Sequence, residues 1–242
     1  QTSHHLASLI ETLPDGLRPH GIDAITYHND MMEIAFINRG YSEKGHLRAS
    51  LIRFNLEQGK ADTAEIDRDD TFCRANDVAF FTNAASRGAL AVSLDRRYCD
   101  GIAALSETMS AAHEGRLVLA DQREENHPPT RLVDHLFFAN GLGIGQPHRP
   151  LDGDNPLIIA ETRARSLSTY ADGSKKPVAA LSGAPDNLSL DPDGAIIAAL
   201  HPNLFRLALY RFAFSGFSQA PSRIVKIAGD TVTTLFDDPD GE

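Results

Sequence analysis

The sequence predicts an all-β fold, a β-propeller of four-stranded blades, and two observations carry this prediction. A pair of small polar residues followed by an alternating apolar strand occurs four times, at His20-Gly21, Asn76-Asp77, Asn140-Gly141 and Asp186-Asn187. Repetition at a period of about 50 residues is typical of propellers and solenoids. Helical patterning is scarce, whereas short apolar runs separated by turn residues are common.

Further strand-like runs follow each repeat and give about four blade-sized units. The runs cover 34–38, 49–54, 78–81, 89–94, 117–120, 157–160, 195–200 and 222–227. The units cover 20–67, 76–134, 140–181 and 186–227. Asp172-Gly173 and Asp193-Gly194 are hairpin turn signals within the last two units. We therefore expect residues 1–242 to form a single propeller domain.

Three segments do not read as ordinary strands. Residues 102–113 indicate a short helix or a long loop inserted in the second unit. Residues 204–214 fit either a long outer strand or a short helix over the mouth of a channel. Residues 145–155 are rich in Gly, Pro and Asp, which is typical of a surface loop.

Composition narrows the classes of partner. The chain has 242 residues, of which 42% are apolar, and a formal net charge of −10. Such an acidic protein is a poor match for nucleic acid or an anionic membrane, and no apolar run approaches the length of a membrane span. Cys73 and Cys99 form one bridge or none, so a secreted, periplasmic or cytoplasmic location stays open.

The repeated polar pairs predict a metal site. The innermost strands of a propeller start around one central channel, so the side chains at these starts should converge. Asn76, Asn140, Asp186 and Asn187 offer oxygen ligands of the kind that Ca²⁺ prefers, and no His or Cys residues have zinc spacing. Any single pair is better explained as a strand start after a turn. Four pairs in the same position of a repeat favour the metal.

Three neighbouring residues complete the candidate site. His20 holds the first place of its unit and is either a general base beside the metal or a histidine that only lines the channel. Asp77 follows Asn76 and should face the other side of its strand. It would hold a second, deeper metal or make a structural hydrogen bond. His201 follows an apolar strand and either caps it near the mouth or contacts the substrate.

Six motifs in order resemble the paraoxonase/arylesterase family and its bacterial relatives labelled gluconolactonase or strictosidine-synthase-like. They are Pro19-His20-Gly21-Ile22, Asn76-Asp77-Val78, Phe138-Ala139-Asn140-Gly141-Leu142, Asp186-Asn187-Leu188, His201-Pro202-Asn203 and Pro221-Ser222-Arg223-Ile224-Val225. The resemblance covers about residues 18–228.

The resemblance implies a six-bladed propeller that holds two calcium ions and hydrolyses lactones or aryl esters. The catalytic ion would take oxygens from Asn76, Asn140, Asp186 and Asn187, and a structural ion would take Asp77. His20 would act near the catalytic ion as the base. The small-molecule lactone or ester would be the partner of the site.

The four visible units imply that parts of the family's first and last blades lie outside this chain, that the ring closes differently, or that a second chain completes it. The family's leading segment also supplies a glutamate to the catalytic calcium, and no matching motif occurs in residues 1–19. Two other functions therefore remain open. One is a non-catalytic, calcium-bound propeller that serves as a binding module, and the other is a strictosidine-synthase-like enzyme without the metal.

Overall fold

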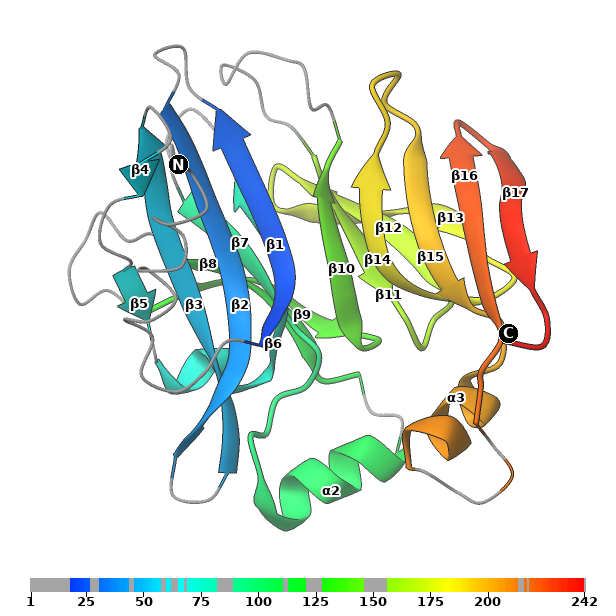
Figure 1. Ribbon diagram of the computed structural model, residues 1–242, viewed down its shortest axis with the longest axis horizontal. Helices are drawn as coiled ribbons and strands as arrows, with labels where there is room; N and C mark the ends of the chain where they lie inside the picture. The colour runs from blue at the N-terminus through cyan, green and yellow to red at the C-terminus, as the bar shows by residue number, and fades with distance from the viewer. Residues whose placement is uncertain are drawn as a thin grey trace.

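The structure is a computed structural model, and it confirms an all-β propeller architecture. It describes residues 18–26, 31–43, 46–57, 60–61, 65–67, 69–81, 89–110, 113–120, 128–145, 156–212, 216 and 218–241. Four antiparallel sheets follow one another along the chain, and in each the strands pair in chain order from the inside outward (Figure 1). The predicted runs of strand lie inside these sheets, except that the run 195–200 begins one residue before β15 (Ile196–His201).

The blades have the following strands. Blade one contains β1 (Pro19–Thr26), β2 (Met31–Glu43) and β3 (His46–Glu57), with the short β4 (Lys60–Ala61) and β5 (Glu65–Asp67) both paired to β3. Blade two contains β6 (Ala75–Phe81), β7 (Ala89–Leu94), β8 (Gly115–Ala120) and β9 (Thr130–Leu136). Blade three contains β10 (Ala139–Ile144), β11 (Leu157–Glu161), β12 (Ser166–Ala171) and β13 (Ser174–Ala180). Blade four contains β14 (Ala184–Leu190), β15 (Ile196–His201), β16 (Ser222–Ala228) and β17 (Thr231–Asp238).

The inner strands of successive blades lie side by side. β1 contacts β6, β6 contacts β10, and β10 contacts β14. Two helices, α2 (Gly101–Ser110) and α3 (Leu204–Arg211), lie beyond the same end of the blades, at the bottom of the view in Figure 1. This is the end at which the inner strands begin, because α2 follows the end of β7 and α3 follows the end of β15.

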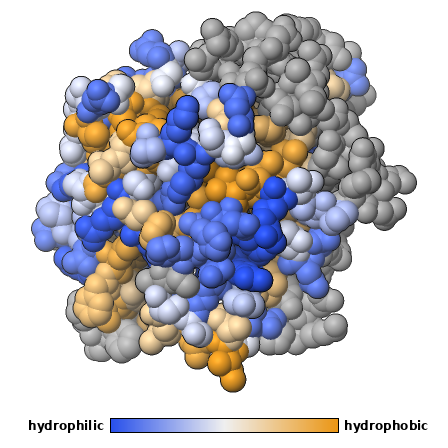
Figure 2. Space-filling model, turned by 180° about the vertical axis from the view of Figure 1, so that it is seen from behind, coloured by the Kyte–Doolittle hydropathy of each residue, from blue (hydrophilic) through white to orange (hydrophobic). Residues whose placement is uncertain are grey.

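The helices settle two of the ambiguous segments. Residues 102–113 contain α2, and residues 204–214 contain the helix α3 rather than a strand. Both helices expose apolar side chains, with Ile102 87% and Phe205 74% exposed. Seen from behind, hydrophilic side chains gather over the middle of the molecule and apolar ones project at its lower tip (Figure 2). No helix within the described ranges has the length and hydropathy needed to span a membrane.

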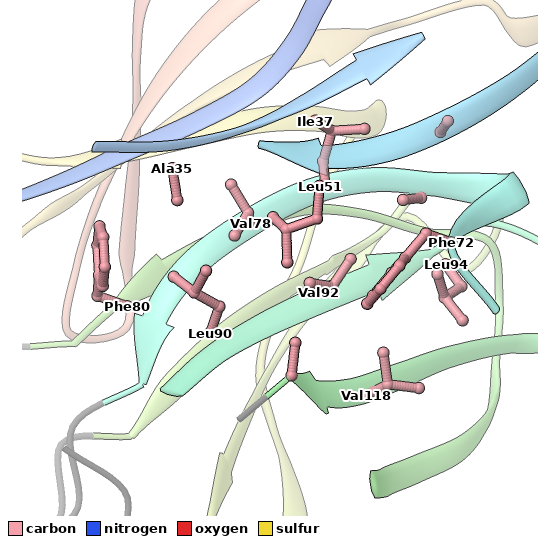
Figure 3. Packing of buried hydrophobic residues seen from close by; sticks show 13 residues of the cluster. Ala35, Ile37, Leu51, Phe72, Val78, Phe80, Leu90, Val92, Leu94 and Val118 are labelled. Atoms are coloured by element: carbon pink, nitrogen blue, oxygen red, sulfur yellow. The ribbon is translucent and has the colours of Figure 1, made fainter. Parts of the chain in front are cut away.

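Apolar side chains between neighbouring blades form the core. Successive residues of a strand face opposite sides, so the middle strands contribute to two clusters at once. Val78 and Phe80 pack in the cluster between blades one and two (Figure 3), whereas Ala79 packs between blades two and three. Ile158 likewise faces blade four and Ile159 faces blade two. Strands buried on both faces read as continuous apolar runs, which explains why the sequence identified them.

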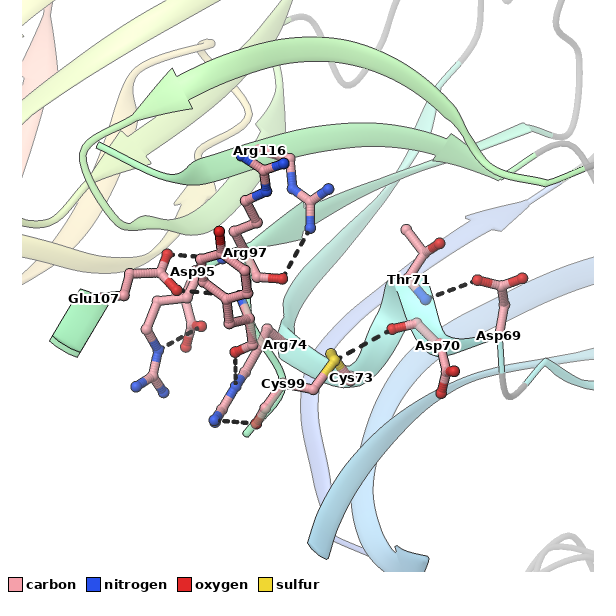
Figure 4. The surroundings of a disulfide bond; sticks show 12 residues. Asp69, Asp70, Thr71, Cys73, Arg74, Asp95, Arg97, Cys99, Glu107 and Arg116 are labelled. Atoms are coloured by element: carbon pink, nitrogen blue, oxygen red, sulfur yellow. Dashed lines mark hydrogen bonds and ion pairs between the residues drawn. A yellow bond between two sulfur atoms is a disulfide. The ribbon is translucent and has the colours of Figure 1, made fainter. Parts of the chain in front are cut away.

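A disulfide joins Cys73 to Cys99, which settles the pairing that the sequence left open. Cys73 lies in the 3-10 helix η1 (Asp70–Arg74), directly before β6, and Cys99 lies in the segment that leads to α2 (Figure 4). Arg74 reinforces the link by donating to the carbonyl oxygens of Tyr98 and Cys99. Glu107 of α2 accepts the backbone N–H groups of Arg97, at 2.8 Å, and Tyr98, at 3.1 Å. The start of β6 and α2 are thus tied together.

Candidate functional site

The four inner strands share one irregularity, and it falls at the polar pairs singled out in the sequence. The register with the next strand shifts between Pro19 and Ile22, between Ala75 and Asp77, between Ala139 and Leu142, and between Pro185 and Leu188. A β-bulge takes residues out of the ladder and re-aims their side chains. His20, Asn76, Asn140 and Asp186 therefore occupy equivalent places in the four blades.

Two of these side chains carry buried oxygens without a partner. Asn76 is 3% exposed and Asn140 is 6% exposed. The Oδ1 atom of each is buried and accepts no hydrogen bond from the described residues. An unsatisfied buried carbonyl costs about 1–3 kcal/mol, so such a group calls for a ligand or an ion. The two amides stand on the adjacent strands β6 and β10, and neutral oxygens of this kind are ligands for a hard cation.

Asp186 adds a carboxylate to this end of the propeller. Its Oδ2 atom lies 2.8 Å from Nε2 of His201. Burial alone would raise the pKa of Asp186, but the hydrogen bond and charge of His201, with Arg211 and His20, hold that pKa below its usual value. Asp186 is therefore ionised at neutral pH. Asn187, which the sequence also offered as a ligand, is exposed.

His20 lies half-buried near the same group of charges. Burial and the charge of Arg39 lower the pKa of His20, and the carboxylates of Asp186 and Asp95 oppose this shift. With the pKa below 6.5, the imidazole is neutral at pH 7 and can accept a proton. His20 and Asp186 each affect the pKa of the other. The start of β1 and the start of β14, the first and last inner strands, therefore interact electrostatically.

Asp77 is placed differently from Asn76. It is 6% exposed, and its two oxygens accept the backbone N–H groups of Val78, at 2.9 Å, and Leu142, at 2.7 Å. Burial raises the pKa of Asp77 to about 7 against these hydrogen bonds, and the charges of Asp23 and Asp186 add to the increase. The bond to Leu142 joins β6 to β10. This arrangement favours the structural hydrogen bond among the two roles that the sequence left open.

A metal at this place would depend on amide oxygens. Within the described ranges, no three His, Cys, Asp or Glu side chains gather closely enough to hold an ion. The donor set that the bulges offer is Asn76 and Asn140 with the single carboxylate of Asp186. Neutral carbonyls with few carboxylates suit Ca²⁺, which accepts many oxygens in loose geometry, so the residues present fit this ion.

Three charged residues of this region escaped the sequence analysis. Arg39 lies in β2, Asp95 directly follows β7, and Arg211 ends α3. The signal that would have revealed the first two is hairpin pairing: Asn38 lies opposite Pro19 and Leu94 opposite Ala75, so the next residue reaches the starts of the inner strands. The same pairing places His201 opposite Ala184, beside Asp186.

Comparisons with known proteins find only remote similarities to solved structures. No family model matches the chain, and no curated protein is similar to it. A gluconolactonase from Xanthomonas campestris is 12% identical, with a TM-score of 0.44 over 93% of this chain and 77% of that one. A protein of unknown function from Dyadobacter fermentans is 11% identical, with a TM-score of 0.47 over 90% and 68%. A thermostable family-43 glycoside hydrolase is 10% identical, with a TM-score of 0.44 over 93% and 76%.

Proposed function

We propose that the strand starts bind Ca²⁺ and that the chain hydrolyses lactones or aryl esters there. The observation that carries the proposal is the pair of buried, unpartnered oxygens of Asn76 and Asn140, at equivalent bulges of β6 and β10. Asp186, at the equivalent bulge of β14, would supply the carboxylate. Asn187 is available as a further oxygen from the exposed side. Asp77 is not a ligand in this proposal, because its oxygens accept the hydrogen bonds that hold β6 and β10 together.

The chain's own residues have separate tasks in this reaction. His20, neutral at pH 7, takes the proton of the water that attacks the carbonyl carbon. His201 holds the carboxylate of Asp186 in place through the contact at 2.8 Å and is also available to contact the substrate. A bound Ca²⁺ supplies electrostatic stabilisation of the negative charge that grows on the carbonyl oxygen.

The protonation of His20 sets the pH dependence. Because burial and Arg39 lower its pKa, the neutral base persists to a pH below 6.5. We expect kcat/KM for phenyl acetate to be level above neutral pH and to fall as the pH drops through this lowered pKa. His20→Gln should remove that acid limb. An identical pH profile in the variant would contradict the role of His20 as the base.

The proposal is tested with phenyl acetate and δ-valerolactone as substrates. Hydrolysis should require added Ca²⁺, stop with a chelator, and disappear in Asn140→Ala with the fold retained. Asn38→Ala is the matched control, because Asn38 is also buried but its oxygen already accepts N–H groups of Arg18 and Gly40. Activity that survives a strong chelator would contradict the proposal.

A binding module without catalysis is the second candidate. It is favoured by the small number of acidic ligands, since Asp186 is the one carboxylate that the bulges offer and His201 already occupies one of its oxygens. Calorimetric binding of Ca²⁺ without turnover of either substrate would identify the chain as such a module.

A further inference from the structure

Arginines crowd the end of the propeller at which the inner strands begin, although the chain as a whole has a net charge of −10. Arg39 extends from β2 to the start of β6, and Arg96 follows β7. Arg163 follows β11, and Arg211 ends α3. Several guanidinium groups therefore lie at this end of an acidic molecule.

The positions of two guanidinium groups are fixed by contacts beside the unpartnered amides. Nε and Nη2 of Arg39 donate to the carbonyl oxygen of Ala75, at 2.9 and 2.6 Å, directly before Asn76. The guanidinium carbon of Arg163 lies 5.3 Å from the ring centre of Phe138, two residues before Asn140. Positive charge thus stands at the start of both β6 and β10.

The contact with Ala75 holds Arg39 without neutralising it. A carbonyl oxygen is uncharged, so Arg39 keeps its charge when it donates to Ala75. Asp95 is the carboxylate shared by Arg39, at 3.5 Å, and Arg96, at 3.2 Å. Both carboxylate oxygens of Glu107 accept hydrogen bonds from backbone N–H groups of the segment before α2 (Figure 4). The guanidinium groups of Arg39 and Arg96 therefore share one carboxylate, that of Asp95.

Among these four arginines, Arg211 is the most exposed to solvent. The helix α3 begins three residues after His201, which contacts Asp186, and Arg211 lies in its last turn. Its charge acts on both His20 and Asp186. The side chain is exposed and makes no hydrogen bond or ion pair within the described part of the chain. It is therefore available to a ligand that enters at this end.

We infer that the substrate of this site carries an anionic oxygen group, a carboxylate or a phosphate, which Arg211 and Arg39 bind beside the reacting ester. This inference rests on the proposed function and specifies its substrate class. The planar guanidinium fork matches both groups, and charge-assisted hydrogen bonds of this kind are the strong ones.

The experiment compares esters that share the acetyl group and differ in charge: phenyl acetate, 4-acetoxybenzoate and 4-acetoxyphenyl phosphate. We expect at least one anionic ester to have a kcat/KM about tenfold above that of phenyl acetate, and the better one identifies the group. In Arg211→Gln this preference should fall about tenfold. We compare the ratio of kcat/KM for anionic and neutral esters, because the charge of Arg211 also acts on the pKa of His20 and would change the rates of all the esters together.

Arg206→Gln is the control, since Arg206 lies on the same helix but donates to the carbonyl oxygen of Asp240. It should keep the preference. Equal rates for charged and neutral esters, or an unchanged ratio in Arg211→Gln, would overturn the inference. If no ester is hydrolysed, the proposed function fails by itself. Calorimetry with 4-hydroxybenzoate, phenyl phosphate and phenol then decides, because only Arg211-dependent binding of an anion supports the inference.

Discussion

Asn140 and Asn38 are both buried asparagines, but their side-chain oxygens have opposite surroundings. The Oδ1 atom of Asn140 accepts no hydrogen bond from the described residues, whereas that of Asn38 accepts the N–H groups of Arg18, at 2.7 Å, and Gly40, at 3.2 Å. This contrast separates an oxygen that is held for a ligand from one that is used in the fold. The difference can be measured as the loss of folding stability that each asparagine-to-alanine substitution causes in the absence of calcium.

We expect Asn140→Ala to lower the free energy of unfolding by less than about 1 kcal/mol in the presence of a chelator, because the oxygen that it removes satisfies no donor. Asn38→Ala should cost about 2 kcal/mol, because it leaves two partly buried N–H groups unpaired. Urea denaturation of both variants checks this. A larger loss in Asn140→Ala than in Asn38→Ala would show that the oxygen of Asn140 has a structural partner.

Asp77 gives a prediction about pH. Its pKa is about 7 in the folded chain and 3.8 for an ordinary aspartate, so the folded state binds the proton more tightly. The contribution of Asp77 to stability is therefore present below pH 4 and is lost as the pH rises to about 7, by roughly 4 kcal/mol at most.

Asp77→Asn cannot titrate at this position, so its free energy of unfolding should fall less than that of the wild type between pH 4.5 and pH 7.5. Urea denaturation with a chelator measures both profiles. Because the comparison concerns the slope, it holds even if the variant is less stable at every pH. Parallel profiles would mean that Asp77 is ionised throughout.

Residue patterns in the sequence identified part of the site. The polar pairs led to His20, Asn76, Asn140 and Asp186, because the same residue types recur at the start of an apolar strand. Arg39 and Asp95 carry no such pattern, since they reach the site through antiparallel pairing with the inner strands. Arg211 depends on the direction in which α3 leaves β15, which no local sequence signal gives.

At the scale of elements, glycine allows the inner strands to approach each other. A Cβ atom at Gly21 would lie 2.0 Å from Oδ1 and 2.3 Å from Cα of Asp77, so β1 could not keep its place beside β6. Gly141 has the same relation to Asp186, with a Cβ atom at 2.4 Å from its backbone oxygen. The glycine in the two pairs that contain one, Gly21 and Gly141, is thus required by packing between blades.

Gly21→Ala should therefore destabilise the protein by about 3 kcal/mol, at the upper end of the range for overpacking, because backbone atoms must move. Gly173→Ala is the comparison: Gly173 has a φ of 74° but no atom within 4 Å of its Cβ position, so only the left-handed backbone costs energy, about 1 kcal/mol. Thermal or urea unfolding ranks the two. A smaller loss in Gly21→Ala would mean that β1 is free to shift.

The outer strands of blades two, three and four were not predicted from the sequence. β9, β13 and β17 fell outside the predicted runs of strand, and most of their residues are exposed or half-buried. Polar outer strands lack the apolar pattern that distinguishes a strand from a loop. The middle strands β7 and β11 were found because both of their faces are buried, whereas the middle strand β12 was missed. The surface loop predicted over 145–155 lies, apart from Gly145, outside the described residues.

At the scale of the whole molecule, the disulfide adds a link along the chain that blade packing does not provide. Cys73 and Cys99 are 26 residues apart. By loop-closure entropy, a bridge across such a loop stabilises the folded state by about 3 kcal/mol. Reduction, or Cys73→Ala with Cys99→Ala, should lower the free energy of unfolding by about this amount. No change on reduction would mean that the thiols are not paired in solution.

The blades converge on one centre only if their inner strands present their side chains to a shared ligand, and the calcium titration tests this most directly. Isothermal titration of Ca²⁺ into the chelator-treated chain should show one site that needs both Asn76 and Asn140. We expect Asn76→Ala and Asn140→Ala each to abolish binding, and Asn38→Ala to retain it. Undiminished binding in both site variants, or no binding to the wild type, would contradict the account.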